Sequence, residues 1–301
     1  MRRLLALLLL APGLVLAQSM EPRAYSNAPT GLNFLLAGYG YSQGDLGFAA
    51  TSPLQDGDSK VHSLLLGYVR SLNLSGDAGS IALLLPIVDL TATATLNGTT
   101  EARREINGMG DPALRLAWNF YGAPALSGLD FGDYRQDLIV GTSLTLTAPF
   151  GQYDPGRLVN IGTNRWSAKP ELGLSKAVGP WTVELAAGVT FFTRNDEFFN
   201  GRTRSQDPIY STQLHATRQF GRGFWGALSA TWYEGGRTSL NGAAQDDRLA
   251  GTRVAATVAL PIDRLNSIKL TASSGVYART GADFEGIGVV WQHLWGGGQS
   301  R

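Results

Sequence analysis

In the stretch LIVGTSLTLT (138–147), Leu138, Val140, Leu144 and Leu146 are spaced by multiples of two residues, and this pattern indicates the fold. A period of two residues is that of a β-strand, whose successive side chains point to opposite faces. The next segment, PFGQYDPG (149–156), contains two prolines and two glycines and cannot continue a strand. After the polar segment RLVNIGTNRW (157–166), residues 168–176 alternate again. The sequence therefore predicts two strands joined by a long polar loop.

The same alternation recurs along the rest of the chain, in strands of about 9 to 12 residues. Short turns and long polar connections alternate between these strands; residues 93–108 are expected to be one of the polar loops, and 122–136 is a connection longer than its place in the pattern suggests. In residues 80–92 the run LLL (83–85) hides the period, so the facing of that strand is not predicted. The predicted strands cover residues 32–41, 61–72, 80–92, 111–120, 138–147, 168–176, 181–192, 209–220, 224–233, 252–260, 268–276 and 286–295.

These features predict an all-β fold, a transmembrane antiparallel up-and-down β-barrel of about 12 strands with long extracellular loops and short periplasmic turns. Strands of this length, aliphatic on one face and polar on the other, suit lipid outside and water inside. A large secreted β-sandwich or a soluble barrel is the alternative, since its strands also alternate. Aromatic residues near the predicted strand ends are typical of interfacial girdles: Trp118, Phe120, Trp166, Trp181, Phe191, Trp232, Tyr277 and Trp295.

Composition narrows the function. The chain has 301 residues, with 25 basic against 24 acidic side chains and no basic cluster, so nothing favours a nucleic-acid partner. The absence of cysteine excludes a disulfide framework, a thiolate metal site and a cysteine nucleophile. The 3 histidines, His62, His215 and His293, are scattered and form no recognisable metal-binding set. No cofactor is expected.

The N-terminus has the pattern of a secretory signal peptide, predicted for residues 1–17. Two arginines precede the apolar run 4–10, and VLA (15–17) precedes the expected cleavage point. Residues 18–30 are expected to form a periplasmic segment, and whether they run free or enter the barrel lumen as a plug is left open. Residues 31–295 are assigned to the barrel and 296–301 to a C-terminal tail.

Several motifs carry a family resemblance: EPRAYSNAPTGLNF (21–34), GMGDP (108–112), PFGQYD (149–154), NIGTNRW (160–166) and KPE (169–171). They resemble the family described as "putative MetA-pathway of phenol degradation", and NIGTNRW is the most specific of them. The resemblance implies a channel in the bacterial outer membrane, linked to uptake of aromatic or other small hydrophobic compounds. It also implies outer-membrane lipids and the barrel assembly machinery as partners. One departure is the tail GGGQSR (296–301), because such barrels often end on an aromatic residue.

Candidate solute-binding residues follow from the expected facing of each strand. Twelve tilted strands would leave a lumen of roughly 10 to 12 Å, enough for a sugar or one aromatic ring. The loop 149–166 is the candidate constriction, and its polar side chains are expected to meet charged groups on the inner wall. The loop candidates are Asp154, Arg157, Asn160, Asn164 and Arg165, and the wall candidates are Asp111, Arg115, Lys169, Glu171 and Glu184. Structural ion pairs, Lys169 with Glu171 and Asp111 with Arg115, are an equal alternative.

The predicted function is passive diffusion of a small, aromatic or hydrophobic solute through a charge-lined lumen. A structural or adhesive barrel without transport is the first alternative. An outer-membrane lipid hydrolase is the second and is not favoured, because only His215 with Ser211 or Thr217 places a hydroxyl on the same strand face as an imidazole. The sequence does not indicate the direction of flow or the oligomeric state.

Overall fold

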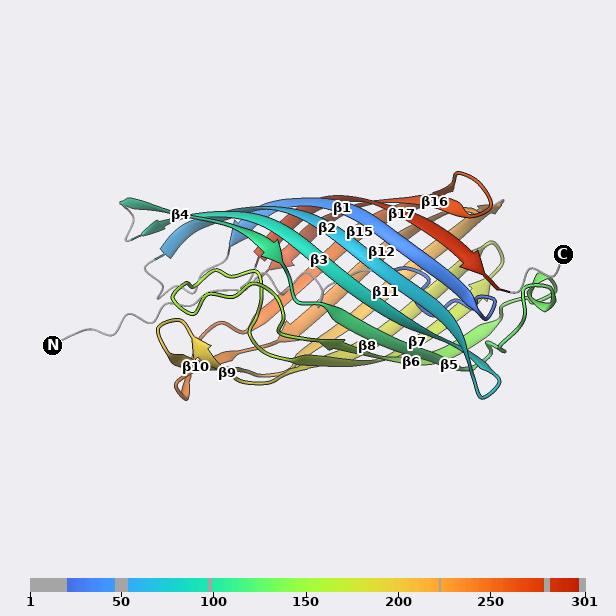
Figure 1. Ribbon diagram of the computed structural model, residues 1–301, viewed down its shortest axis with the longest axis horizontal. Helices are drawn as coiled ribbons and strands as arrows, with labels where there is room; N and C mark the ends of the chain where they lie inside the picture. Colours follow the sequence, from blue (N-terminus) through green and yellow to red (C-terminus); the bar gives the residue numbers. More distant parts are fainter. Residues whose placement is uncertain (1–20, 47–53, 97–98, 222, 279–281, 298–301) are drawn as a thin grey trace.

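The computed structural model describes residues 21–46, 54–96, 99–221, 223–278 and 282–297, which form an antiparallel β-barrel (Figure 1). The predicted signal peptide, 1–17, lies outside these ranges. The only helical turn within them is the 3₁₀ turn η1, Asp130–Gly132. None of the described segments is a helix long and apolar enough to cross a membrane.

The barrel wall is a closed sheet in which each strand pairs with its neighbours in the ring, and β2 pairs with β3 to close it. The predicted bounds of β6 and β8 agree with those found, and the other predicted strands lie within or overlap the strands observed. The strands of the wall are β1 Leu32–Leu46, β2 Leu54–Leu74, β3 Asp77–Leu96, β4 Thr100–Met109, β5 Ala113–Tyr121, β6 Leu138–Thr147, β7 Ser167–Val178, β8 Trp181–Phe192, β11 Ile209–Gly221, β12 Phe224–Gly235, β15 Leu249–Pro261, β16 Asn266–Ala278 and β17 Ala282–Gly296.

One of the predicted loops is a strand. Residues 93–108 were expected to be a polar loop, yet β3 continues to Leu96 and β4 pairs with it from Thr100 to Met109. The charges of β4 lie on both faces of the strand, at half-exposed or exposed positions, so the sequence shows no apolar alternation, although the backbone pairs and Ile106 is buried. β4 and β5 pair with successive parts of β3 and share one place in the ring, which therefore has the predicted twelve positions.

The two ends of the barrel differ. The end at which Leu32 pairs with Gly296 carries short turns, such as Ser75–Gly76 between β2 and β3, and we call it the short-turn end. The opposite, long-loop end carries the connection 148–166 and a small separate sheet (Figure 1). That sheet consists of β9 Asn195–Phe198, β10 Arg202–Gln206, β13 Thr238–Leu240 and β14 Ala243–Ala244. The connection 122–137 is the exception, because it lies at the short-turn end.

The outer face of the barrel is apolar and bounded by aromatic rings. On β8, Val183 and Leu185 are exposed whereas Glu184 and Ala186 between them are buried, which confirms the predicted facing. The eight aromatic residues proposed as girdles are all exposed. Four lie toward the short-turn end, namely Trp118, Phe120, Trp181 and Trp295, and four toward the long-loop end, namely Trp166, Phe191, Trp232 and Tyr277.

Candidate functional site: a cavity in the barrel lumen

The barrel encloses a cavity of about 770 Å³, which we call the lumenal cavity. Strands from around the ring line it, together with the chain before β1 and part of the loop between β6 and β7. A volume of this size is typical of sites for small organic ligands. Six of the ten candidate residues line the cavity: Asp111, Arg115, Arg165, Lys169, Glu171 and Glu184.

One wall of the lumenal cavity is apolar. It is formed by the inward-facing side chains of β1, β2 and β3, and we call it the apolar wall. Its residues are Phe34, Leu36, Leu65, Val69, Leu84, Pro86 and Val88. The expectation of a lumen lined by charge is therefore wrong for this side. On these strands both faces are apolar, as LLL (83–85) illustrates, so alternation cannot distinguish inside from outside.

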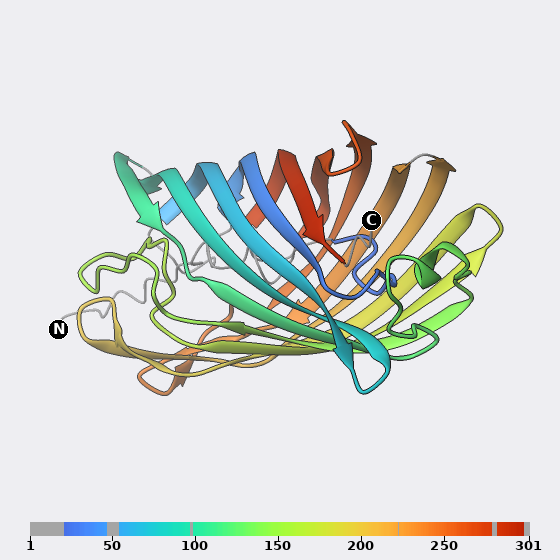
Figure 2. The ribbon, with the colours of Figure 1, turned by 45° about the vertical axis from the view of Figure 1, so that its right-hand side comes forward.

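The opposite wall is polar and is contacted by the chain preceding β1. Residues 21–30, which we call the lumenal segment, lie inside the ring of strands (Figure 2). The backbone N–H of Arg23 donates a 2.5 Å hydrogen bond to Glu184 Oε2, and Glu21 forms a 2.6 Å ion pair with Lys269. Arg23 has φ 68°, a left-handed conformation that is unfavourable for a residue with a Cβ. The charge-assisted bond to Glu184 helps to stabilise that conformation.

Tyr25 is the most deeply buried residue of the lumenal segment. Its side chain is 1% exposed, and its hydroxyl donates to Glu171 Oε1 at 2.9 Å and lies 3.3 Å from the Ser143 hydroxyl. Glu171 also forms a 2.8 Å ion pair with Lys169, which is one of the two structural pairs considered from the sequence. The guanidinium of Arg115 lies 5.7 Å from the centroid of the Tyr25 ring, within cation–π range. Arg115 thus contacts the lumenal segment, and not Asp111.

The lumenal segment is held at the short-turn end as well. Asn27 Nδ2 donates to Pro124 O at 3.1 Å, and the Thr30 N–H donates to Leu126 O at 2.9 Å. The irregular connection 122–137 therefore serves as a support for the segment. Residues 21–30 were expected to be periplasmic, with entry into the lumen left open; their contacts place them in the lumen, whereas residues 18–20 lie outside the described ranges.

The loop between β6 and β7 also folds inward, and Asp111 holds it. The Asp111 carboxylate accepts bonds from Gly151 N (2.9 Å), Thr163 N (2.8 Å) and Thr163 Oγ1 (2.6 Å). Of the five wall candidates, Asp111 alone hydrogen-bonds to this loop among the described residues. Arg115, Glu171 and Glu184 contact the lumenal segment, and Lys169 pairs with Glu171. The structure thus brings one of the wall candidates, Asp111, together with the loop.

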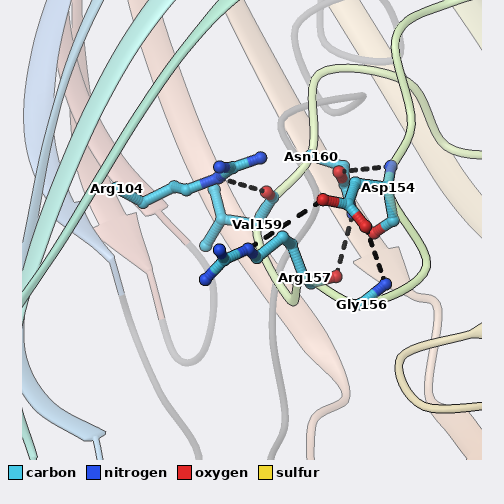
Figure 3. Close-up of polar contacts among 6 residues, drawn as sticks. All are labelled: Arg104, Asp154, Gly156, Arg157, Val159 and Asn160. Carbon is cyan, nitrogen blue, oxygen red and sulfur yellow. Dashed lines mark hydrogen bonds and ion pairs between the residues drawn. The ribbon is translucent and has the colours of Figure 1, made fainter.

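Within the loop, Asn160 organises the turn (Figure 3). Its side chain is buried, accepts from Asp154 N at 2.9 Å and donates to the carbonyls of Asp154 and Arg157 at 3.0 Å each. Asp154 and Arg157 are exposed, face each other at 3.9 Å and do not line the cavity. Asn160 and Asn164 do not line it either; Asn164 Nδ2 donates to Asn195 Oδ1 at 3.1 Å. These four residues shape the loop.

Two buried arginines lie at the long-loop end of the lumenal cavity. Arg165, from the loop, and Arg204, from β10, both line it. Burial, reinforced by the positive charge of Arg204, lowers the pKa of Arg165 to about 9. Burial likewise lowers the pKa of Arg204, and the negative charge of Asp247 opposes this shift. The cavity therefore has a positively charged end and an apolar side.

The histidine considered for hydrolysis has a different partner from those expected. His215 is buried, and its Nδ1 lies 2.8 Å from the hydroxyl of Ser229 on β12, not from Ser211 or Thr217. Ser229 does not line the cavity, and no carboxylate hydrogen-bonds to His215 in the parts of the chain that the structure describes. The described residues also contain no group of acidic and histidine side chains that could hold a metal ion.

The sequence did not indicate whether residues 18–30 enter the lumen, and it did not identify Arg23 and Tyr25, the apolar wall or Arg204 as site residues. Tyr25 and Glu171 are 146 residues apart, and a short irregular segment has no periodicity to report its position. Arg204 stands in a charged stretch between two strands, where nothing distinguishes a buried charge from a solvated one. The motif EPRAYSNAPTGLNF (21–34) was the one signal that this segment has a specific role.

Comparison with known proteins agrees with this architecture. Residues 31–292 match the family described as "Putative MetA-pathway of phenol degradation". Among curated proteins none matches the chain. The crystal structure of the COG4313 outer membrane channel from Pseudomonas putida F1 superposes with a TM-score of 0.78 at 20% identity, covering 92% of this chain and 100% of that one. The likeness at this identity shows the fold.

Two autotransporter domains are more distant. The β domain of Bordetella BrkA has a TM-score of 0.53 at 11% identity and covers 88% of this chain and 100% of its own. The transport unit of AIDA-I from Escherichia coli has a TM-score of 0.52 at 9% identity, with coverages of 92% and 93%. The first of these three solved structures is described as an outer membrane channel, and the other two are parts of autotransporters.

Proposed function

Since the chain belongs to the family described as "Putative MetA-pathway of phenol degradation", we propose that it is an outer-membrane channel for the passive diffusion of small hydrophobic solutes. The long-loop end faces the cell exterior in this proposal and the short-turn end faces the periplasm, as in bacterial outer-membrane barrels. The observation that carries the proposal is the apolar wall within the lumenal cavity. The side chains of Phe34, Leu36, Leu65 and Leu84 on the inner face provide no hydrogen-bond partners for the hydroxyl groups of a sugar.

An apolar solute gains binding free energy when it leaves water and contacts the apolar wall. Burying apolar surface is worth roughly 25 cal/mol per Å², so a single aromatic ring gains on the order of 1.5 to 3 kcal/mol on contact with the wall. A sugar gains little there and loses part of its hydration. The polar wall keeps the opposite side of the lumen wetted, and a solute with one polar group is thereby oriented.

Passage requires the lumenal segment and the inward loop to move. The segment crosses the lumen between Glu184 and the short-turn end, and its bonds to Glu171, Glu184 and Pro124 hold it there. Each is a local contact on a stretch of chain outside the barrel sheet, so the segment can be displaced without breaking a strand pair. We therefore expect conductance to be low at rest and to rise when these bonds are weakened.

Conductance of the refolded chain in a planar bilayer tests the proposal. We expect small current steps, interrupted reversibly by a monoaromatic alcohol such as 2-phenylethanol and left unchanged by glucose at the same concentration. Interruption by glucose alone would contradict a hydrophobic lumen and favour a sugar pore. A properly folded barrel, verified by its heat-modifiable mobility, that neither conducts nor binds 2-phenylethanol would favour the structural or adhesive alternative.

A further inference from the structure

The proposed passage of a hydrophobic solute does not require the arginine pair at the long-loop end of the lumenal cavity. Arg165 and Arg204 are each 7% exposed, and both line the cavity. Burying a charged group is costly unless an opposite charge or hydrogen bonds compensate. Placing two positive charges in the same buried region increases this free-energy cost. A bound anion would lower it.

Most of the hydrogen-bonding capacity of the pair is unused. Arg165 Nη2 donates to Gln206 Oε1, whereas Arg165 Nη1 is buried without a hydrogen-bond partner. The guanidinium of Arg204 takes part in no hydrogen bond or ion pair within the described ranges. An aromatic ring covers one face of each guanidinium. The Cζ atom of Arg165 lies 4.3 Å from the centroid of the Phe192 ring, and that of Arg204 lies 5.2 Å from the centroid of the Phe198 ring. Stacking on a ring leaves the N–H edges of a guanidinium available to a ligand.

The nearest carboxylates are engaged elsewhere. Asp111 accepts its bonds from Gly151 and Thr163, and Asp247 accepts from the backbone N–H and hydroxyl of Thr238. Their charges favour the protonated state of the two arginines. Among the ion pairs found between described residues, however, neither aspartate pairs with Arg165 or Arg204. The protein supplies the balancing charge at a distance and leaves the donors free.

The apolar wall starts beside the pair. Thr163 and Ile161, from the same loop as Arg165, line the cavity, and Ile161 packs with Val61, Leu90 and Ile106 in a buried cluster. The N–H of Gly110, next to Asp111, donates to Pro86 O of the apolar wall at 2.8 Å. A molecule with an anionic group on the arginines would therefore extend directly onto apolar side chains.

We propose that Arg165 and Arg204 bind the carboxylate of an amphipathic organic acid whose apolar body lies along the apolar wall. The guanidinium fork matches the two oxygens of a carboxylate, and such charge-assisted bonds are among the strongest in proteins. A volume of about 770 Å³ accommodates an acid with one aromatic ring or a medium-length chain. This inference rests on the proposed channel function and specifies the class of solute.

Calorimetric titration of the full chain in lipid nanodiscs tests it with two probes, 4-phenylbutyrate and its neutral analogue 4-phenylbutanol. We expect the acid to bind at least about tenfold more tightly than the alcohol. Arg204→Gln and Arg165→Gln should each weaken binding of the acid by about tenfold to a hundredfold, as expected for loss of a bond to a charged group, and should leave binding of the alcohol unchanged. Arg157→Gln is the matched control, since Arg157 is exposed on the same loop and does not line the cavity.

The outcomes separate the two proposals. Equal affinity for acid and alcohol, unaltered in the heat-modifiable Arg204→Gln protein, overturns the carboxylate site and leaves the hydrophobic channel standing. A loss of acid binding that Arg157→Gln shares would assign the effect to general surface charge and also overturns the site. Failure of both probes to bind removes the hydrophobic channel together with the site. Arg204→Gln keeps the test valid if Arg165→Gln fails to fold.

Discussion

A methyl group added to Gly173 would lie 2.1 Å from Cε2 of Tyr25, so the tyrosine ring rests directly on the backbone of that glycine. Gly141 pairs with Gly173 across β6 and β7, and a methyl group there would lie 2.8 Å from Cδ1 of the same ring. The two missing side chains leave a depression in the inner wall that Tyr25 fills. The barrel wall is thus shaped to hold the lumenal segment.

Gly173→Ala should displace the lumenal segment without disturbing the barrel. The atoms that the new methyl group would meet belong to the Tyr25 ring and not to the wall, so the ring must move. We expect trypsin to cleave after Arg23 at least about tenfold faster than in the unaltered protein, because cleavage requires the segment to leave the lumen. Gly226→Ala is the control: this strand glycine has ordinary contacts of 3.5 Å and beyond. Equal cleavage of both variants would contradict the role of the glycine pair.

Tyr25→Phe tests the polar half of the same contact. The ring remains on Gly141 and Gly173, whereas the bond to Glu171 and the contact with Ser143 are lost. A bond to a charged group is worth about 1.5 to 3 kcal/mol, so the opening equilibrium of the segment should rise about tenfold to a hundredfold. Hydrogen exchange of the amides of residues 21–30 measures it. Tyr153→Phe removes a tyrosine hydroxyl that bonds to Glu197 O at the long-loop end, away from the lumenal segment, and should leave this exchange unaltered.

Asp111→Asn should loosen the loop between β6 and β7. The asparagine side chain keeps one acceptor oxygen. Its NH₂ group replaces the other carboxylate oxygen and cannot accept the hydrogen bond that this oxygen receives from the N–H of Gly151 or of Thr163. We expect the free energy of unfolding to fall by about 1.5 to 3 kcal/mol, read from the urea midpoint by tryptophan fluorescence. Asp154→Asn, on the exposed part of the loop, should change it by less than about 0.5 kcal/mol. A smaller loss for Asp111→Asn than for Asp154→Asn would show that Asp111 does not hold the loop.

The barrel could be predicted because most of its strands have the same feature, one apolar face that points outward. Residues 138–147 and 181–192 have the same bounds in the structure as in the prediction. The prediction failed at β4, Thr100–Met109, where the charges Arg103 and Glu105 share the exposed face and a third, Arg104, lies on the face that buries Ile106, so the apolar alternation is hidden. The backbones of β3 and β4 pair in this region although the side chains of β4 no longer alternate between apolar and polar.

The site was harder to predict, because its geometry depends on contacts between distant parts of the chain. Lys169, Glu171 and Glu184 line the lumenal cavity, but the two glutamates bond to the lumenal segment and Lys169 pairs with Glu171, so none of the three meets the loop in the way expected. The inward position of Leu65 and Leu84 was not predicted, because the strands that carry them are apolar on both faces. Knowing which leucine faces inward required the register of β1 to β3.

Whether hydrophobic solutes pass through the barrel can be measured by the uptake of the hydrophobic dye N-phenyl-1-naphthylamine by cells that make this protein. The dye fluoresces once it passes the outer membrane, and we expect its rate of uptake to rise on expression and to fall about threefold to tenfold in Leu65→Asn, which puts an amide on the apolar wall. Ser63→Asn introduces the same side chain on the inner face of β2, where the wall is already polar, and should leave the rate unchanged. Uptake that is the same in both variants, and the same as in cells without the protein, would contradict a hydrophobic channel.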